Sequence, residues 1–138
     1  MEKEIKPIKD QIWYILTGHS IFIKNFIDKH TSTYLFNQLE KEVKYIPRNE
    51  LKFLAPNGQN IPLPRIKQFY GTIDENGDYP IYKYSNDVYP KVLPWTPTLK
   101  IIKDLLENEC NVILNHLVLN KYENENDYIG YNYLICII

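Results

Sequence analysis

Cysteine is scarce in this sequence, which has 2 cysteines, Cys110 and Cys136, in 138 residues. They have no short metal-ligand spacing, so neither a disulfide framework nor a zinc site is expected. Long apolar runs are also missing. The final run, 134–138, is far too short to cross a bilayer, and the charged N-terminus lacks the apolar segment of a secretory signal. We therefore expect an intracellular, soluble protein, with nucleus and cytoplasm both open.

An excess of charge of either sign is absent as well. The sequence has 16 Lys and Arg against 17 Asp and Glu, a formal net charge of -1. No global basic field therefore points to nucleic acid, although a neutral chain can still carry a local basic groove. Hydrophobic residues make up 44% and charged residues 24%, which is ordinary for a globular domain with a sizeable core. We predict a charged arm over 1–11 and one domain over 12–138.

The pattern of apolar residues predicts two helices among short strands. One helix covers 31–43 and is capped by a Thr or Ser near its start, and the other covers 97–109, with Thr96 as N-cap and Pro97 at the first position. Their buried faces are predicted to be Leu35, Phe36, Leu39 and Val43, and Leu99, Ile102, Leu105 and Leu106. Strands are predicted at 13–16, 21–27, 51–54, 66–71, 79–85 and 112–122. Because helices and strands do not alternate regularly, we expect an α+β fold with two helices packed on a mainly antiparallel sheet.

Polar side chains gather on one face of the predicted strand 112–122. Asn120 and Tyr122 lie two residues apart and therefore point to the same face, together with His116 and Val118. An amide, a phenol and an imidazole can together line a small polar pocket. The alternative is a strand end where Asn and Tyr meet water, and a His116 that is simply hydrogen-bonded. The residues alone leave both interpretations open.

Sequence patterns in five segments agree in order and spacing with those of one known family. They are a helix at 35–43, Pro-Arg…Tyr-Gly at 64–71, an aromatic pair before Ser at 82–85, Pro-Trp…Pro…Leu at 94–99, and Asn-x-Tyr…Ile-Gly at 115–131. Together they resemble the AlkB family of iron(II)- and 2-oxoglutarate-dependent dioxygenases, most closely its eukaryotic-type DNA-repair branch. One departure is Asn86, which stands where the family has Gly.

The resemblance implies roles for particular residues. Asn120 and Tyr122, as the family's Asn-x-Tyr pair, would contact the co-substrate 2-oxoglutarate. Tyr82 and Tyr84 would lie beside the damaged base, because a flipped base needs an aromatic stacking surface. Ordinary strand packing is the alternative for both tyrosines.

Arg65 has its own place in the resemblance. It falls in the region of the family's DNA-contacting lid, whose counterpart here is 51–64. A contact with a DNA phosphate and simple solvation at the surface are both open for its guanidinium.

The resemblance stops where the family places its iron ligands. After Ile-Gly-x the family has His-x-Asp, and here the two positions carry Asn132 and Leu134. Iron(II) in this class is held by two His and one carboxylate, and none of the chain's three histidines is placed to replace them. We expect no metal ligands, no iron(II) binding, and a chain that is a truncated N-terminal portion of the family domain.

The fold that the resemblance implies is an incomplete double-stranded β-helix, or jelly-roll, with an N-terminal extension. In such a fragment the strand 112–122 would keep an unpaired edge, through which the chain could self-associate. The function implied is oxidative dealkylation of bases in DNA or RNA, with the chain inactive by itself. The alternative is a non-catalytic nucleic-acid-binding or interaction module derived from the same fold.

Overall fold

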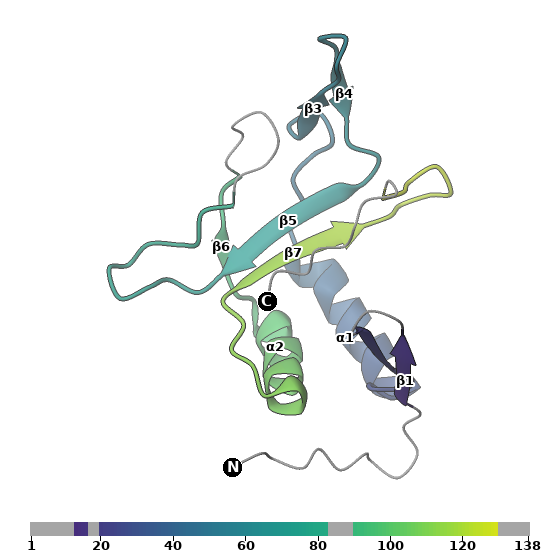
Figure 1. Ribbon diagram of the computed structural model, residues 1–138, viewed down its shortest axis with the longest axis vertical. Helices are drawn as coiled ribbons and strands as arrows, with labels where there is room; N and C mark the ends of the chain where they lie inside the picture. Colours follow the sequence, from purple (N-terminus) through teal and green to yellow (C-terminus); the bar gives the residue numbers. More distant parts are fainter. Residues whose placement is uncertain (1–12, 17–19, 83–89, 130–138) are drawn as a thin grey trace. The chain divides into compact units, whose positions relative to one another are not determined.

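The computed structural model describes residues 13–16, 20–82 and 90–129 (Figure 1). The protein is α+β, with two helices and short strands among these residues. It divides into two compact units, Met1–Glu42 and Val43–Ile138, and each is described by itself. The predicted charged arm, 1–11, lies outside the described residues.

The first unit holds a hairpin followed by a helix. Strands β1 (Trp13–Leu16) and β2 (Ser20–Ile23) pair antiparallel, so the second strand ends earlier than the predicted range 21–27. Helix α1 (Lys29–Glu42) begins before the predicted cap. The reason is Asp28, whose carboxylate accepts a hydrogen bond from the Thr31 backbone N–H at 2.9 Å. Aspartate at this position satisfies a backbone donor of the first turn, so Asp28 takes the capping role.

The predicted buried face of α1 is only partly buried. Leu35 is 4% exposed, as predicted, whereas Phe36 is 61% exposed. Residues i and i+1 of a helix point about 100° apart, so Phe36 lies at the margin of a stripe that is centred near Leu35.

The second unit is organised around strand β5 (Ile66–Gly71), shown in teal in Figure 1. It pairs antiparallel with β7 (His116–Lys121) and parallel with the short β6 (Leu93–Pro94), giving the strand order β6-β5-β7. The sheet is therefore mixed, not uniformly antiparallel. Its register runs from Ile66 opposite Lys121 to Gly71 opposite His116.

A second hairpin lies in the predicted lid. Strands β3 (Lys52–Leu54) and β4 (Asn60–Pro62) pair antiparallel. The turn between them uses Gly58 at a φ of 82°, a conformation that glycine adopts without steric cost.

The hydrophobic core of this unit joins β5 to the ends of the lid hairpin. It consists of Leu51, Leu63, Phe69 and Val92, with Ile46, Tyr82 and Val118 packed against it. Phe69 is fully buried, with 0% of its surface exposed. Leu51 and Leu63 come from just outside the two strands of the hairpin, so this core fixes the base of the predicted lid beside β5.

Helix α2 (Pro97–Cys110) follows its local sequence signals closely. The Thr96 side chain accepts from the Leu99 backbone N–H at 3.2 Å, and proline occupies the first turn. Both features confirm the prediction. Leu99 is buried, but Leu105 and Leu106 are 40% and 37% exposed, so the predicted face is covered only near the start of the helix. Within the described part of the chain, neither helix has the length and apolarity needed to cross a membrane.

Two further predicted strands need correction. Strand β7 runs from His116 to Lys121 and does not begin at residue 112, because hydrogen bonds tie 112–115 to α2 and to the residue that follows β5. The Leu114 N–H donates to Glu107 Oε1 at 2.7 Å, and the Asn115 carbonyl accepts from the Thr72 N–H at 2.9 Å. Of the predicted strand 79–85, the described residues 79–82 are not in a strand.

Candidate functional site

One face of the β5–β7 strand pair carries several of the residues that the sequence analysis selected. Lys67 lies opposite Asn120, and Phe69 lies opposite Val118. Residues directly opposite in an antiparallel pair project from the same face of the sheet. His116, Val118 and Asn120 therefore share one face, as predicted.

Arg65 is the residue that joins these strands chemically. Its Nε–H donates to Asn120 Oδ1 at 3.1 Å, and its Nη1 donates to the Tyr128 carbonyl at 3.1 Å. The residue is 8% exposed, so solvation at the surface, one of the two alternatives for it, does not fit. A contact between Arg65 and DNA stays a prediction, because the described contacts of its guanidinium are all within the chain.

Lys67 adds a second buried cation beside Asn120. It is 4% exposed, and burial, together with the neighbouring charge of Arg65, lowers the pKa of its ammonium group to about 8. At neutral pH the group is still mostly protonated. The face that carries Asn120 therefore holds two positive charges at low exposure, which is unusual for Lys and Arg.

The predicted co-substrate tyrosine is more open. Tyr122 follows the last residue of β7 and is 47% exposed. It lies two residues beyond Asn120 in the chain, at the solvent-exposed end of the strand. A phenol in this position can donate a hydrogen bond to a ligand that enters from solvent.

Tyr82 is partly buried and packs against the core of the second unit. Its ring centroid lies 4.9 Å from that of Phe69 and 5.4 Å from that of His116, and the His116 ring is stacked on it. Ordinary packing, the alternative that the sequence left open, therefore describes these contacts. Tyr84, the other predicted base-stacking residue, lies outside the described residues, and so do Asn132 and Leu134.

His116 is held by packing more than by hydrogen bonds. Its Nε2 is buried and has no hydrogen-bond partner in the described part of the chain. Burial lowers the pKa of the imidazole, which is therefore neutral at pH 7. A neutral ring stacked on Tyr82 acts as part of the core wall.

An ion-pair clamp closes the loop that follows β7. Arg48 Nη2 pairs with Glu123 Oε2 at 2.9 Å and with the carboxylate of Asp127. The Asp127 side chain is 3% exposed and also accepts from the Glu123 backbone N–H at 2.7 Å. The hydrogen bond from Arg48 is the main reason that the pKa of Asp127 is lowered. The clamp therefore ties the 123–127 loop to residue 48, ahead of the lid hairpin.

Removing Arg48 leaves a buried carboxylate without its cation. We expect Arg48→Ala to lower the melting temperature by roughly 5–10 °C. The Asp127 carboxylate would keep the cost of its desolvation but lose the cation that offsets it. Differential scanning calorimetry measures this. Lys100→Ala, a charge removed from the exposed face of α2, is the matched control and should change little.

Two further measurements test the cause of that loss. Adding Asp127→Asn to Arg48→Ala should restore part of the melting temperature, because the unpaired charge is then gone. The native pKa of Asp127 lies below its ordinary value of 3.8. Its contribution is therefore present above that pH and lost as pH falls through the native pKa. A difference between wild type and Arg48→Ala that persists unchanged at strongly acid pH would contradict the clamp.

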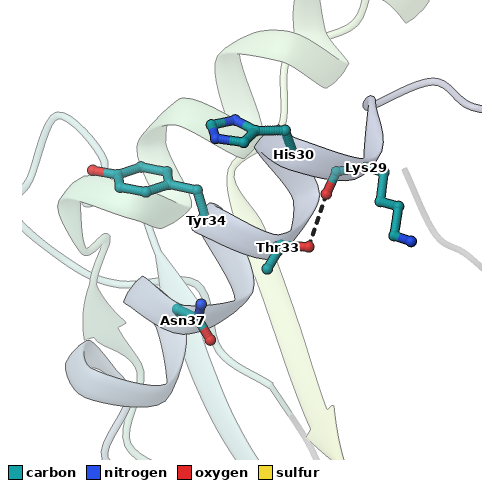
Figure 2. A pocket seen from close by; sticks show the side chains of 5 residues that line it. All are labelled: Lys29, His30, Thr33, Tyr34 and Asn37. Atoms are coloured by element: carbon teal, nitrogen blue, oxygen red, sulfur yellow. Dashed lines mark hydrogen bonds between the residues drawn. The ribbon is translucent and has the colours of Figure 1, made fainter.

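Helix α1 carries a concave patch that is a weaker candidate. Figure 2 shows its five side chains, which all project from one helix: Lys29, His30, Thr33, Tyr34 and Asn37. Thr33 Oγ1 donates to the Lys29 carbonyl at 2.8 Å, which is a local helix contact. The patch brings together no distant segments of the sequence, unlike the face of β5 and β7.

Comparison with known proteins does not assign the chain to a family. No protein-family model matches it. A search of curated proteins finds no match either. Among the described residues, no group of three or more His, Cys, Asp or Glu side chains gathers in a way that could hold a metal ion. The polar cluster of Arg65, Lys67 and Asn120 is the one that includes residues selected from the sequence.

Sequence reasoning found some of these residues and missed others. Asn120 and Arg65 were selected from the family pattern, but their mutual hydrogen bond was not foreseen. Lys67 could have been predicted from the sequence, because it lies two residues after Arg65 and side chains two apart in a strand project from the same face. Nothing in the sequence pointed to Arg48, which lies 79 positions from its partner Asp127.

Proposed function

We propose that this chain carries the 2-oxoglutarate side of an AlkB-like dioxygenase site, from a domain whose reaction is the oxidative dealkylation of nucleic acid bases. One observation carries the proposal. The family's Pro-Arg position and its Asn-x-Tyr position, 55 residues apart, meet in a hydrogen bond between Arg65 and Asn120. The resemblance was drawn from separate segments, and two of them form one polar site.

The chemistry of this site suits a carboxylate. Asn120 supplies an amide and Tyr122 a phenol, both of which can donate to carboxylate oxygens. Arg65 and Lys67 add positive charge at low exposure, and hydrogen bonds to ionised groups are stronger in such surroundings. 2-Oxoglutarate carries two carboxylates, so this donor set fits the co-substrate that the resemblance implies.

The donor set does not fit iron. Asn132 and Leu134 stand at the family's ligand positions, and leucine has no donor atom. The described residues contain no cluster that could replace them. We therefore assign no step through iron to this chain and propose that, by itself, it binds the co-substrate without oxidative turnover.

The wider fold is part of the same proposal. In the described sheet β7 is an edge strand, paired on one side with β5. A double-stranded β-helix would place a further strand along its other edge. The same edge could pair with a second copy of the chain, because an open edge presents unpaired backbone donors and acceptors.

The nucleic acid partner rests on the resemblance alone. Tyr82 packs against Phe69 and His116, so its ring would have to leave these contacts to stack fully on a base. The competing function, a nucleic-acid-binding module without a co-substrate site, predicts salt-dependent DNA binding and no response to 2-oxoglutarate.

Titration calorimetry with 2-oxoglutarate tests the proposal directly. We expect the wild-type chain to bind it, and Asn120→Ala and Tyr122→Phe each to weaken binding by roughly tenfold, the effect of about 1.4 kcal/mol. Tyr34→Phe, an exposed tyrosine on α1, is the matched control and should bind as wild type does. If the wild-type chain shows no binding at millimolar 2-oxoglutarate but binds single-stranded DNA at low salt, the competing function replaces this one.

A further inference from the structure

The hydrogen bond from Arg65 determines which way the Asn120 amide faces. A guanidinium has only donors, so the atom of Asn120 that lies 3.1 Å from Arg65 Nε must be the carbonyl oxygen, Oδ1. The NH2 group, Nδ2, is consequently turned away from Arg65. Without such a partner, an asparagine amide can rotate by 180° and exchange its donor for its acceptor.

Arg65 is well placed to hold this orientation. It is 8% exposed, and its Nη1 donates to the Tyr128 carbonyl at 3.1 Å. The Tyr128 N–H in turn donates to the Pro64 carbonyl at 2.9 Å. The guanidinium is therefore fixed by two hydrogen bonds. Because it is planar and held at two points, it cannot easily move with the Asn120 amide if that amide rotates.

The charges around the amide favour an anion. No described carboxylate pairs with Arg65, whose partners are the amide of Asn120 and a backbone carbonyl. Lys67 lies directly opposite Asn120 across the β5–β7 pair. The buried guanidinium of Arg65 therefore carries a desolvation cost that a bound anion would offset.

We propose that Arg65 is a positioning residue of the 2-oxoglutarate site, and that its Nε–H holds the Asn120 amide with the NH2 group directed at a carboxylate of the co-substrate. The inference rests on the function proposed above and extends it to a residue that the resemblance places in the DNA-contacting region. Arg65 acts through Asn120 and needs no contact of its own with the ligand.

A double-mutant cycle measured by calorimetric titration of 2-oxoglutarate into the full chain tests this role. Arg65→Ala is expected to weaken binding roughly tenfold, about as much as Asn120→Ala. The double variant should bind only slightly more weakly than Asn120→Ala alone, because once the amide is gone Arg65 has nothing to position and contributes only its charge. Lys121→Met, which removes a positive charge from the adjacent residue on the opposite face of β7, should stay within about twofold of wild type.

Two conservative variants separate orientation from charge and from folding. Arg65→Lys keeps the charge but loses the planar Nε–H, so we expect weakened binding with an intact amide NMR spectrum. Asn120→Asp keeps an acceptor for Arg65 but has no NH2 donor, so we expect a melting temperature at or above that of wild type together with lost binding.

The outcomes distinguish this inference from the function on which it rests. If the wild-type chain binds 2-oxoglutarate but Arg65→Lys binds equally well, or if the losses of Arg65→Ala and Asn120→Ala add in full, then Arg65 does not act through Asn120 and the proposed function stands. If the wild-type chain binds no 2-oxoglutarate, the proposed function itself fails and the role assigned to Arg65 fails with it.

Discussion

Replacing Phe69 with alanine should destabilise the second unit more than any other single change that we consider. Phe69 has 0% of its surface exposed and shares the core with Leu51, Leu63 and Val92. Truncating a fully buried phenylalanine removes its burial energy and leaves a cavity, at a cost of about 3–5 kcal/mol. Urea denaturation followed by tryptophan fluorescence measures the change, and Trp95 belongs to the affected unit.

Substitutions at Phe69 also test the proposed function, because Phe69 lies on β5 close to Lys67. Phe69 lies two residues from Lys67 on the same face of β5, so its ring supports the strand that carries the buried cation. Phe69→Leu should cost much less and leave 2-oxoglutarate binding measurable. Phe36→Ala on α1, where the side chain is 61% exposed, is the matched control and should shift the free energy of unfolding by less than about 0.5 kcal/mol. Equal losses for Phe69→Ala and Phe36→Ala would show that the core is not where we place it.

Local signals in the sequence predicted local structure well. Thr96 and Pro97 are a cap and a first-turn proline, and α2 begins where they place it. Strand β5 follows its predicted range, 66–71. Both features depend on residues within one turn or one short run. The start of α1 was misplaced for the same kind of reason, since Asp28 lies just ahead of Thr31 and competes with it as a cap.

Long-range features could not be predicted in this way. The Arg65–Asn120 hydrogen bond spans 55 positions, and the clamp between Arg48 and Asp127 spans 79. Polar pairs of this kind have no periodicity of their own, and their geometry follows only once β5 and β7 are in register. The packing of Tyr82 depends in the same way on His116, which reaches it from β7.

The family resemblance predicted more than the local signals did, but less than the long-range contacts. It selected Arg65 and Asn120 without showing that they touch, and it assigned Arg65 to DNA although the residue is 8% exposed. A sequence pattern identifies the positions that matter, but it does not show which residues each of them contacts. Register and burial supply the contacts, and they place Arg65 against Asn120 and the Tyr128 carbonyl.

Gly71 is the position where we expect the sheet to be least tolerant of added volume. A Cβ there would lie 2.9 Å from Val92 Cγ1 and 3.1 Å from the Asn115 carbonyl oxygen. That carbonyl accepts the Thr72 N–H at 2.9 Å, so it cannot retreat without loss of a hydrogen bond. We expect Gly71→Ala to lower the free energy of unfolding by about 1–3 kcal/mol, the usual cost of overpacking, measured by urea denaturation.

Gly58 provides the control that separates crowding from backbone strain. A Cβ at Gly58 would meet nothing within 4 Å, but its φ is 82°. Gly58→Ala should therefore cost about 1 kcal/mol from strain alone. Val92→Ala should recover part of the loss in the Gly71→Ala background, although it is destabilising by itself, because it removes the nearest clashing methyl group. If Val92→Ala instead adds its full cost to Gly71→Ala, the two side chains do not meet, and the packing of Val92 against the junction of β5, β6 and β7 is wrong.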